Sequence, residues 1–114
     1  MEHIIYHNPR CSKSRQTLGI LQDKGAQIKI IEYLKNIPSK EELSRLISLL
    51  EITPLELIRK GETIFKENYK GKELSDTEWI DAMISHPKLI ERPIVTFGKK
   101  AIIGRPPEKV MELI

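Results

Sequence analysis

The stretch HIIYHNPRCSKSRQTLGILQDKGAQIKIIEYL, residues 3–34, decides the fold because two apolar segments flank an amphipathic one. The apolar run at 4–7 and the β-branched run at 28–34 each have the composition of a β-strand. Between them, an apolar stripe on residues 12–24 predicts a helix, which Gly25 would end as the C′ residue. A strand, a helix and a second strand with short connections form a βαβ unit, so we expect the two strands to be parallel.

Three capping-box patterns predict that the middle of the chain is helical. In this pattern Ser or Thr at the N-cap is followed three positions later by Glu, and it occurs at Ser39, Thr53 and Ser75. The first box precedes a regular amphipathic helix, and the second predicts a short helix ending near residue 60. The third begins a helix that His86-Pro87 ends. The polar stretch at 61–74 is expected to hold a short helix or an ordered loop.

The last quarter of the chain returns to strand patterns. Residues 93–97 and 100–103 predict two antiparallel strands joined by a tight turn, and Pro106-Pro107 open a terminal helix. The element order is therefore β-α-β, a helical segment, β-β and α. This order predicts an α/β fold with a thioredoxin-like mixed four-stranded sheet. We expect a single domain over residues 1–114, with a helical insertion at about 39–86.

The composition limits which classes of partner and which cellular compartment we expect for the protein. The 114 residues carry a formal net charge of +3, with one Trp, three Tyr and two Phe. Nucleic-acid binding requires clustered cations with stacking aromatics, so we expect no nucleic-acid partner. A single cysteine permits no internal disulfide and fits a reducing cytoplasm. Neither a secretory signal nor an apolar run long enough to span a membrane is evident. No spacing of His, Cys and Asp suggests a metal site, and we expect a monomer.

Cys11 is the only cysteine, and it lies where the first strand gives way to the first helix. A thiol at a helix start faces unpaired backbone N–H groups and the positive end of the helix dipole, which favour the nucleophilic thiolate. Arg10, Lys13, Arg15 and His7 are close in sequence and would act in the same direction. The alternative is a buried apolar cysteine that only fills space. The polar turn around Cys11 favours the nucleophile and suggests a thiol that attacks a small anion.

Three further arginines lie at the ends of predicted elements: Arg59 ends a short helix, Arg92 precedes the third strand, and Arg105 follows the fourth. A guanidinium can hold two oxygens of a tetrahedral anion in its planar fork. Each arginine taken singly could equally be a solvated residue at a chain reversal. In a thioredoxin-like fold, however, the first helix start faces the loop before the third strand, which places Arg92 near Cys11. The same fold predicts a cis peptide bond at Pro93.

The segments around Cys11 and the three arginines are similar to those of a known family, and the similarity extends along nearly the whole chain. The chain resembles the glutaredoxin-dependent arsenate reductase family, in its short arsenate-reductase-like branch, through residues 6–15, 57–60, 91–95 and 103–107. In that family a cysteine attacks arsenate to form a covalent arsenic–sulfur adduct. Glutathione then attacks the adduct, and glutaredoxin resolves the product to release arsenite. The resemblance implies a cytoplasmic thiol-dependent oxidoreductase with no bound cofactor and with glutathione as co-substrate.

Carried over residue by residue, the resemblance makes Cys11 the nucleophile. It implies that Arg59, Arg92 and Arg105 bind the oxyanion and stabilise the adduct, and that His7 helps to set the pKa of the thiol. These roles agree with charge-stabilised covalent catalysis. A capped structural histidine is the alternative for His7. The expected partners are arsenate or another small oxyanion, glutathione and glutaredoxin.

Two other functions fit the same superfamily. An Spx-like regulator would bind RNA polymerase, but such regulators sense redox state through a CxxC pair. This chain has Ser14 at the second position, so a regulator here would be redox-blind. A glutathione-linked thiol oxidoreductase acting on glutathionylated proteins would use Cys11 without needing the three arginines together. Arg10 and Lys13 would also suit a glutathione carboxylate, another oxyanion or an acidic protein surface.

Overall fold

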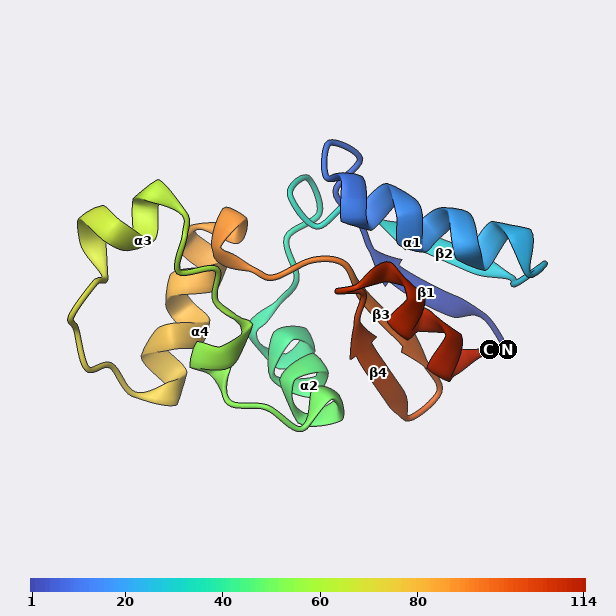
Figure 1. Ribbon diagram of the computed structural model, residues 1–114. Helices are drawn as coiled ribbons and strands as arrows, with labels where there is room; N and C mark the ends of the chain where they lie inside the picture. Colours follow the sequence, from blue (N-terminus) through green and yellow to red (C-terminus); the bar gives the residue numbers. More distant parts are fainter. The chain divides into compact units, whose positions relative to one another are not determined.

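A four-stranded mixed sheet organises residues 1–36 and 92–114, which form one of two compact units and are called the sheet unit below. The computed structural model describes residues 1–114, and Figure 1 labels its α-helices and strands. The spatial order is β2-β1-β3-β4, formed by β1 (His3–Tyr6), β2 (Ile28–Ile31), β3 (Ile94–Phe97) and β4 (Lys100–Ile103). β1 pairs in parallel with β2 and antiparallel with β3, and β3 pairs antiparallel with β4. The predicted βαβ unit and the predicted antiparallel pair are therefore confirmed.

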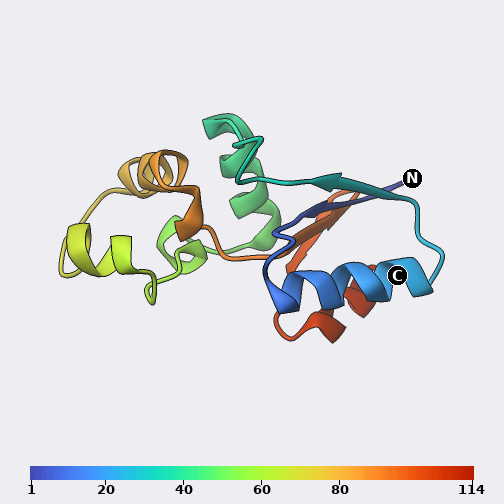
Figure 2. The same cartoon turned by 90° about the horizontal axis from the view of Figure 1, so that it is seen from above.

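Two helices cover one face of this sheet. α1 (Ser12–Asp23) and the 3₁₀ helix η3 (Pro107–Leu113) lie on the same side of the strands in Figure 2 and contact each other. The apolar core of the unit consists of Ile5, Leu21, Val95, Val110 and Leu113. Burying an aliphatic side chain of this size contributes about 1.5–3 kcal/mol. The cluster therefore holds α1, and the loop in front of it, firmly against the sheet.

Residues 37–91 form the second compact unit, called the helical unit below. It contains α2 (Lys40–Leu50), η1 (Pro54–Leu57), α3 (Thr63–Asn68), α4 (Asp76–Ser85) and η2 (Pro87–Leu89). The predicted N-caps are confirmed, because the backbone N–H three positions later donates to the hydroxyl of Ser39, Thr53 and Ser75. At Thr53 and Ser75 the glutamate carboxylate also accepts from the N-cap backbone N–H, which completes the box. The predicted helical segment at about 39–86 lies within this unit, and its status as an insertion in a single domain stays a prediction.

Two elements end about three residues earlier than the sequence pattern predicts. β2 stops at Ile31 rather than at residue 34, because the Glu32 carbonyl accepts backbone N–H groups three and four positions later and turns the chain. η1 stops at Leu57 rather than near residue 60. There, Ile58 is extended and forms an antiparallel bridge with Ile90. In both places a contact outside the local helix or strand pattern ends the element.

The hairpin of β3 and β4 brings two arginine-bearing corners together. Ile94 pairs with Ile103 at the end of the ladder, and just beyond it the Gly104 N–H donates to the Pro93 carbonyl at 2.9 Å. The Arg92–Pro93 peptide bond is cis, as predicted, and the Arg105–Pro106 bond is cis as well. Arg92 and Arg105 thus enter and leave the hairpin at the same end of the sheet.

Candidate active site

A hydrogen-bonded turn places Cys11 at the N-cap of α1. The Asn8 carbonyl accepts the Cys11 N–H at 3.0 Å, and the Asn8 side-chain oxygen accepts the Arg10 N–H at 3.0 Å. Asn and Pro commonly begin such turns, because the Asn side chain bonds the following backbone and Pro presets its own φ. Arg15 reaches back from α1 and donates from Nη1 to the Pro9 carbonyl at 2.9 Å. The short polar sequence before α1 therefore fixes where the thiol is presented.

The surroundings of Cys11 favour the thiolate. Partial burial by itself raises the pKa of the thiol, but the backbone N–H of Ser14, the Arg92 guanidinium and the backbone N–H of Lys13 together lower it below its ordinary value. Arg92 acts both as a hydrogen-bond donor to the sulfur and as a nearby positive charge. The helix N-terminus and one arginine therefore both stabilise the negative sulfur. A thiolate of this kind is the reactive form of cysteine.

Arg105 connects the sulfur to the loop before β3. Its Nη2 donates to Cys11 Sγ at 3.5 Å, and its Nε donates to the Arg92 carbonyl at 2.8 Å. The second bond ties the Arg105 side chain to the backbone of the residue whose own guanidinium lies beside the thiol. The structure thus brings together three of the predicted site residues, Cys11, Arg92 and Arg105, within the sheet unit. One thiolate and two guanidinium groups at one place can bind and attack a small oxyanion.

His7 contacts the site through Ser14. His7 is buried, and its Nδ1 lies 2.6 Å from Ser14 Oγ, which also accepts the Asn8 N–H at 3.1 Å. Burial lowers the pKa of His7; Glu32 opposes that shift and Arg15 adds to it. Ser14 is itself fully buried, and its backbone N–H is one of the groups that lower the Cys11 pKa. The contact between the His7 imidazole and the Ser14 hydroxyl therefore holds in place the Ser14 backbone N–H that faces the Cys11 sulfur.

Ser14 is a site residue that the sequence analysis did not predict. There, Ser14 served only to show that the second cysteine of a CxxC pair is missing. The spacing of residues along α1 contains a signal that could have identified Ser14. Residues 14, 17 and 21 follow Cys11 at helical spacing on one side of α1, and all three are buried. A small polar residue at that position, one turn after the cysteine, must find its hydrogen bonds inside the protein.

Arg59 belongs to the helical unit, where two carboxylates hold its side chain. Its Nη1 lies 3.2 Å from Glu62 Oε2, and its Nε lies 3.3 Å from Glu91 Oε1. Its backbone N–H donates to the Leu89 carbonyl at 2.7 Å, next to the Ile58–Ile90 bridge. The guanidinium is therefore well ordered within its own unit, and a role beside Cys11 stays a prediction.

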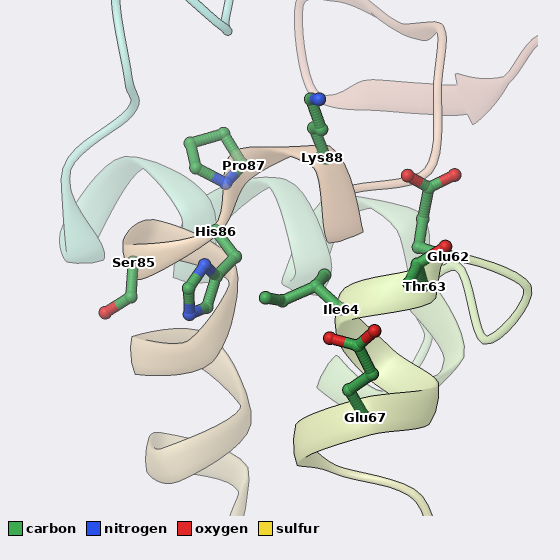
Figure 3. Close-up of a pocket in the computed structure, with 8 residues that line it drawn as sticks. All are labelled: Glu62, Thr63, Ile64, Glu67, Ser85, His86, Pro87 and Lys88. Atoms are coloured by element: carbon green, nitrogen blue, oxygen red, sulfur yellow. The ribbon is translucent and has the colours of Figure 1, made fainter.

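The helical unit also contains a pocket of about 490 Å³ between α3 and the end of α4. Figure 3 shows the Glu67 carboxylate and the His86 ring on opposite walls, with Ile64 between them. The pocket offers neither a thiol nor a guanidinium, so it lacks the chemistry assembled around Cys11. No group of His, Cys, Asp and Glu side chains in the chain is arranged to hold a metal ion. No helix has the length and apolar character needed to cross a membrane.

Known proteins resemble this chain in sequence and in fold. The profile of the ArsC family matches residues 6–113, which include Cys11, Arg59, Arg92 and Arg105. The chain is 45 % identical over 116 residues to an arsenate reductase of Haemophilus influenzae, with 100 % of each chain covered. It is 45 % identical over 112 residues to the uncharacterized protein YfgD of Escherichia coli, covering 96 % of this chain and 94 % of that one. A solved arsenate reductase from Vibrio cholerae matches with a TM-score of 0.94 at 46 % identity, over 100 % of this chain and 98 % of that one. The predicted thioredoxin-like α/β fold is confirmed by this match.

Proposed function

The chain belongs to the ArsC family, and from that premise we propose that it is a thiol-dependent oxidoreductase that reduces arsenate. The observation that carries the proposal is the contact of Cys11 Sγ with the Arg105 guanidinium at 3.5 Å, beside Arg92. Two fixed cations next to a stabilised thiolate suit a nucleophilic attack on an anion, which would otherwise be repelled by the negative sulfur. The relatives named arsenate reductase supply the identity of that anion.

In the first step, the Cys11 thiolate attacks the arsenic atom of arsenate. An arsenic–sulfur bond forms, one arsenic–oxygen bond breaks, and the oxygen leaves as water after taking up protons. Arsenic stays in its pentavalent state. Arg92 and Arg105 would hold the remaining oxygens and neutralise the charge that develops on them, because guanidinium groups bind oxyanions through paired N–H donors. Family resemblance assigns Arg59 the same task.

The electrons come from two external thiols. The chain has one cysteine, so no second thiol of its own can form a disulfide. Glutathione attacks the adduct and displaces a second oxygen as water. The glutaredoxin thiolate then attacks the glutathione sulfur and forms a mixed disulfide with it, and the electron pair of the bond between arsenic and the glutathione sulfur stays on arsenic, which becomes trivalent while still bound to Cys11. Water then displaces the Cys11 thiolate from arsenic, which releases arsenite and regenerates the free thiol. Both thiols are common in the reducing cytoplasm, where we propose that the protein works as a monomer.

The test is arsenate reduction by the purified protein with glutathione and glutaredoxin. We expect turnover that is lost in Cys11→Ser and reduced at least tenfold in Arg92→Ala and Arg105→Ala, since removing one anion-stabilising donor typically costs about 10²–10³ in rate. The activity of Arg59→Ala shows whether the third arginine contributes to arsenate reduction. Arg45→Ala, an exposed arginine on α2, is the control and should retain full activity.

Failure of the intact protein to reduce arsenate, with Cys11 still reactive toward alkylating agents, would overturn this proposal. Reduction of glutathionylated peptides would then favour a glutathione-linked oxidoreductase. Loss of activity in Arg45→Ala to the same extent as in Arg92→Ala would show that the effect is not specific to the site.

A further inference from the structure

A pocket of about 240 Å³ lies directly beside the turn that presents Cys11. One wall is the loop from His7 to Arg10, and the other is the segment after β2 that carries Glu32, Leu34 and Lys35. The two loops leave the same ends of the parallel strands β1 and β2 (Figure 1). The His7 N–H also donates to the Ile31 carbonyl at 2.8 Å, which ties the starts of the two loops together. The pocket therefore belongs to the sheet unit and shares a wall with the candidate site.

The pocket presents two cations and one anion. Arg10 and Lys35 are exposed, and Glu32 lines the pocket together with the buried His7, whose pKa is lowered by burial and raised by Glu32. Lys35 Nζ lies 3.7 Å from Glu32 Oε1, with 77 % and 39 % of the two side chains exposed. An exposed pair of this kind contributes little to stability, at most about 1 kcal/mol. Both groups are consequently available to exchange this weak contact for a ligand.

We propose that this pocket binds the charged peptide portion of glutathione, with carboxylates on Arg10 and Lys35 and the ammonium on Glu32. The proposal rests on the proposed function, in which glutathione attacks the adduct on Cys11. Glutathione carries two carboxylates and one ammonium at neutral pH, and the pocket carries the opposite set of charges.

The size of the pocket and its reach agree with this ligand. A volume of about 240 Å³ is below the roughly 300–1,000 Å³ of sites for drug-sized ligands, so it suits one end of a tripeptide. Arg10 and Cys11 are neighbours in the chain, which puts their Cα atoms about 3.8 Å apart. The backbone of Arg10, which lines the pocket, is therefore joined directly to the residue that carries the reacting sulfur. The thiol of the bound peptide can point toward Cys11 while its charged end stays in the pocket.

The first measurement is the binding of S-methylglutathione, which cannot react, by calorimetry and by NMR shifts. We expect shifts at Glu32 and Lys35, and Kd values about threefold to fivefold weaker in Lys35→Ala and in Glu32→Gln, the scale of one lost exposed charge pair. The control variants Lys109→Ala and Glu108→Gln change exposed residues of η3 and should bind normally. Unchanged affinity in both pocket variants, or equal losses in the controls, would overturn the proposal.

A second ligand tests the ammonium contact. N-acetyl-S-methylglutathione lacks the positive charge, so it should bind the natural protein about threefold to fivefold less tightly than S-methylglutathione. It should lose no further affinity in Glu32→Gln, because the partner of the ammonium is already absent. An equal additional loss in Glu32→Gln would contradict the assignment of Glu32.

Kinetics separate this proposal from the proposed function. If arsenate is reduced, Lys35→Ala and Glu32→Gln should raise the KM for glutathione and leave the KM for arsenate unchanged. An unchanged KM for glutathione in both variants would overturn the pocket assignment while the reductase activity stands. If arsenate is not reduced but the two variants still weaken S-methylglutathione binding, the reductase proposal is wrong and the pocket assignment holds.

Discussion

Replacing Gly104 by alanine is expected to push apart the two corners that carry Arg92 and Arg105. A Cβ atom at residue 104 would lie 2.5 Å from Thr17 Oγ1, 2.8 Å from Pro93 Cγ and 3.1 Å from Thr17 Cγ2. Favourable separations between non-bonded carbon atoms are about 3.5–4.0 Å. Thr17 is fully buried on α1, and Pro93 is a buried ring. The added methyl group can therefore be accommodated only if these buried side chains, or the backbone of α1 and of residues 93 and 104, move.

The expected cost follows from these distances. Adding a methylene to a packed interior costs about 1–3 kcal/mol, and two contacts at or below 2.8 Å put Gly104→Ala in the upper half of that range. For a chain of this length, that loss lowers Tm by about 6–18 °C. Because Arg105 follows Gly104, the contact of Arg105 Nη2 with Cys11 Sγ should lengthen as well. Urea unfolding monitored through Trp79 and calorimetric Tm measure the loss.

Gly19→Ala is the matched control. No atom lies within 4 Å of a Cβ built at Gly19, which is inside α1, so alanine there should stabilise the protein by about 0.5–1 kcal/mol. In a Thr17→Ala background, which removes two of the three close atoms, Gly104→Ala should cost less than it does in the natural protein. A Gly104→Ala variant within about 0.5 kcal/mol of the natural protein, an effect typical of neutral surface substitutions, would refute the packing argument.

Three further predictions address the thiol, the buried histidine and a helix cap. Arg92→Ala should raise the Cys11 pKa, so the midpoint of alkylation rate against pH should move to higher pH; an unmoved midpoint would count against Arg92 as the stabilising charge. Burial lowers the pKa of His7 in the folded protein. Below about pH 6.5, the imidazole is therefore protonated in the unfolded chain but still neutral in the folded chain. The free energy of unfolding consequently falls as the pH drops toward the pKa of His7 in the folded protein. The difference in unfolding free energy between the natural protein and His7→Gln, measured by urea titration, should therefore narrow on acidification. A difference that stays constant with pH would contradict the lowered pKa of His7. Ser75→Ala should cost about 1 kcal/mol in unfolding free energy. Ser44→Ala, exposed within α2, should not be destabilising, and an equal loss there would argue against a capping effect.

Much of the architecture could be predicted because its signals are local. The capping boxes at Thr53 and Ser75 join groups three residues apart, so the pattern of residue types predicts the contact directly. The parallel pairing of β1 with β2 follows from the strand–helix–strand order and the short connections. The position of Cys11 at the N-cap of α1 follows from the polar turn before it.

The residues that surround Cys11 depend on contacts that no local pattern contains. Arg105 lies 94 positions from Cys11 in the chain, and only the register of β3 with β4 brings it to the sulfur. The same is true of its bond to the Arg92 carbonyl and of the close approach of Gly104 to Thr17. Family resemblance pointed to the arginines, but it did not reveal how the protein holds them.

The sequence by itself determined where helices begin, which strands form the βαβ unit and that the single cysteine stands at a helix start, because hydrogen bonds between near neighbours and short connections specify these features. Tertiary structure alone decided that β2 ends at Ile31, that Ser14 is buried against His7, and that Arg59 is held by Glu62 and Glu91. Partners in these contacts are chosen by packing and by the need to satisfy buried polar groups. Those requirements arise only once distant segments have come together.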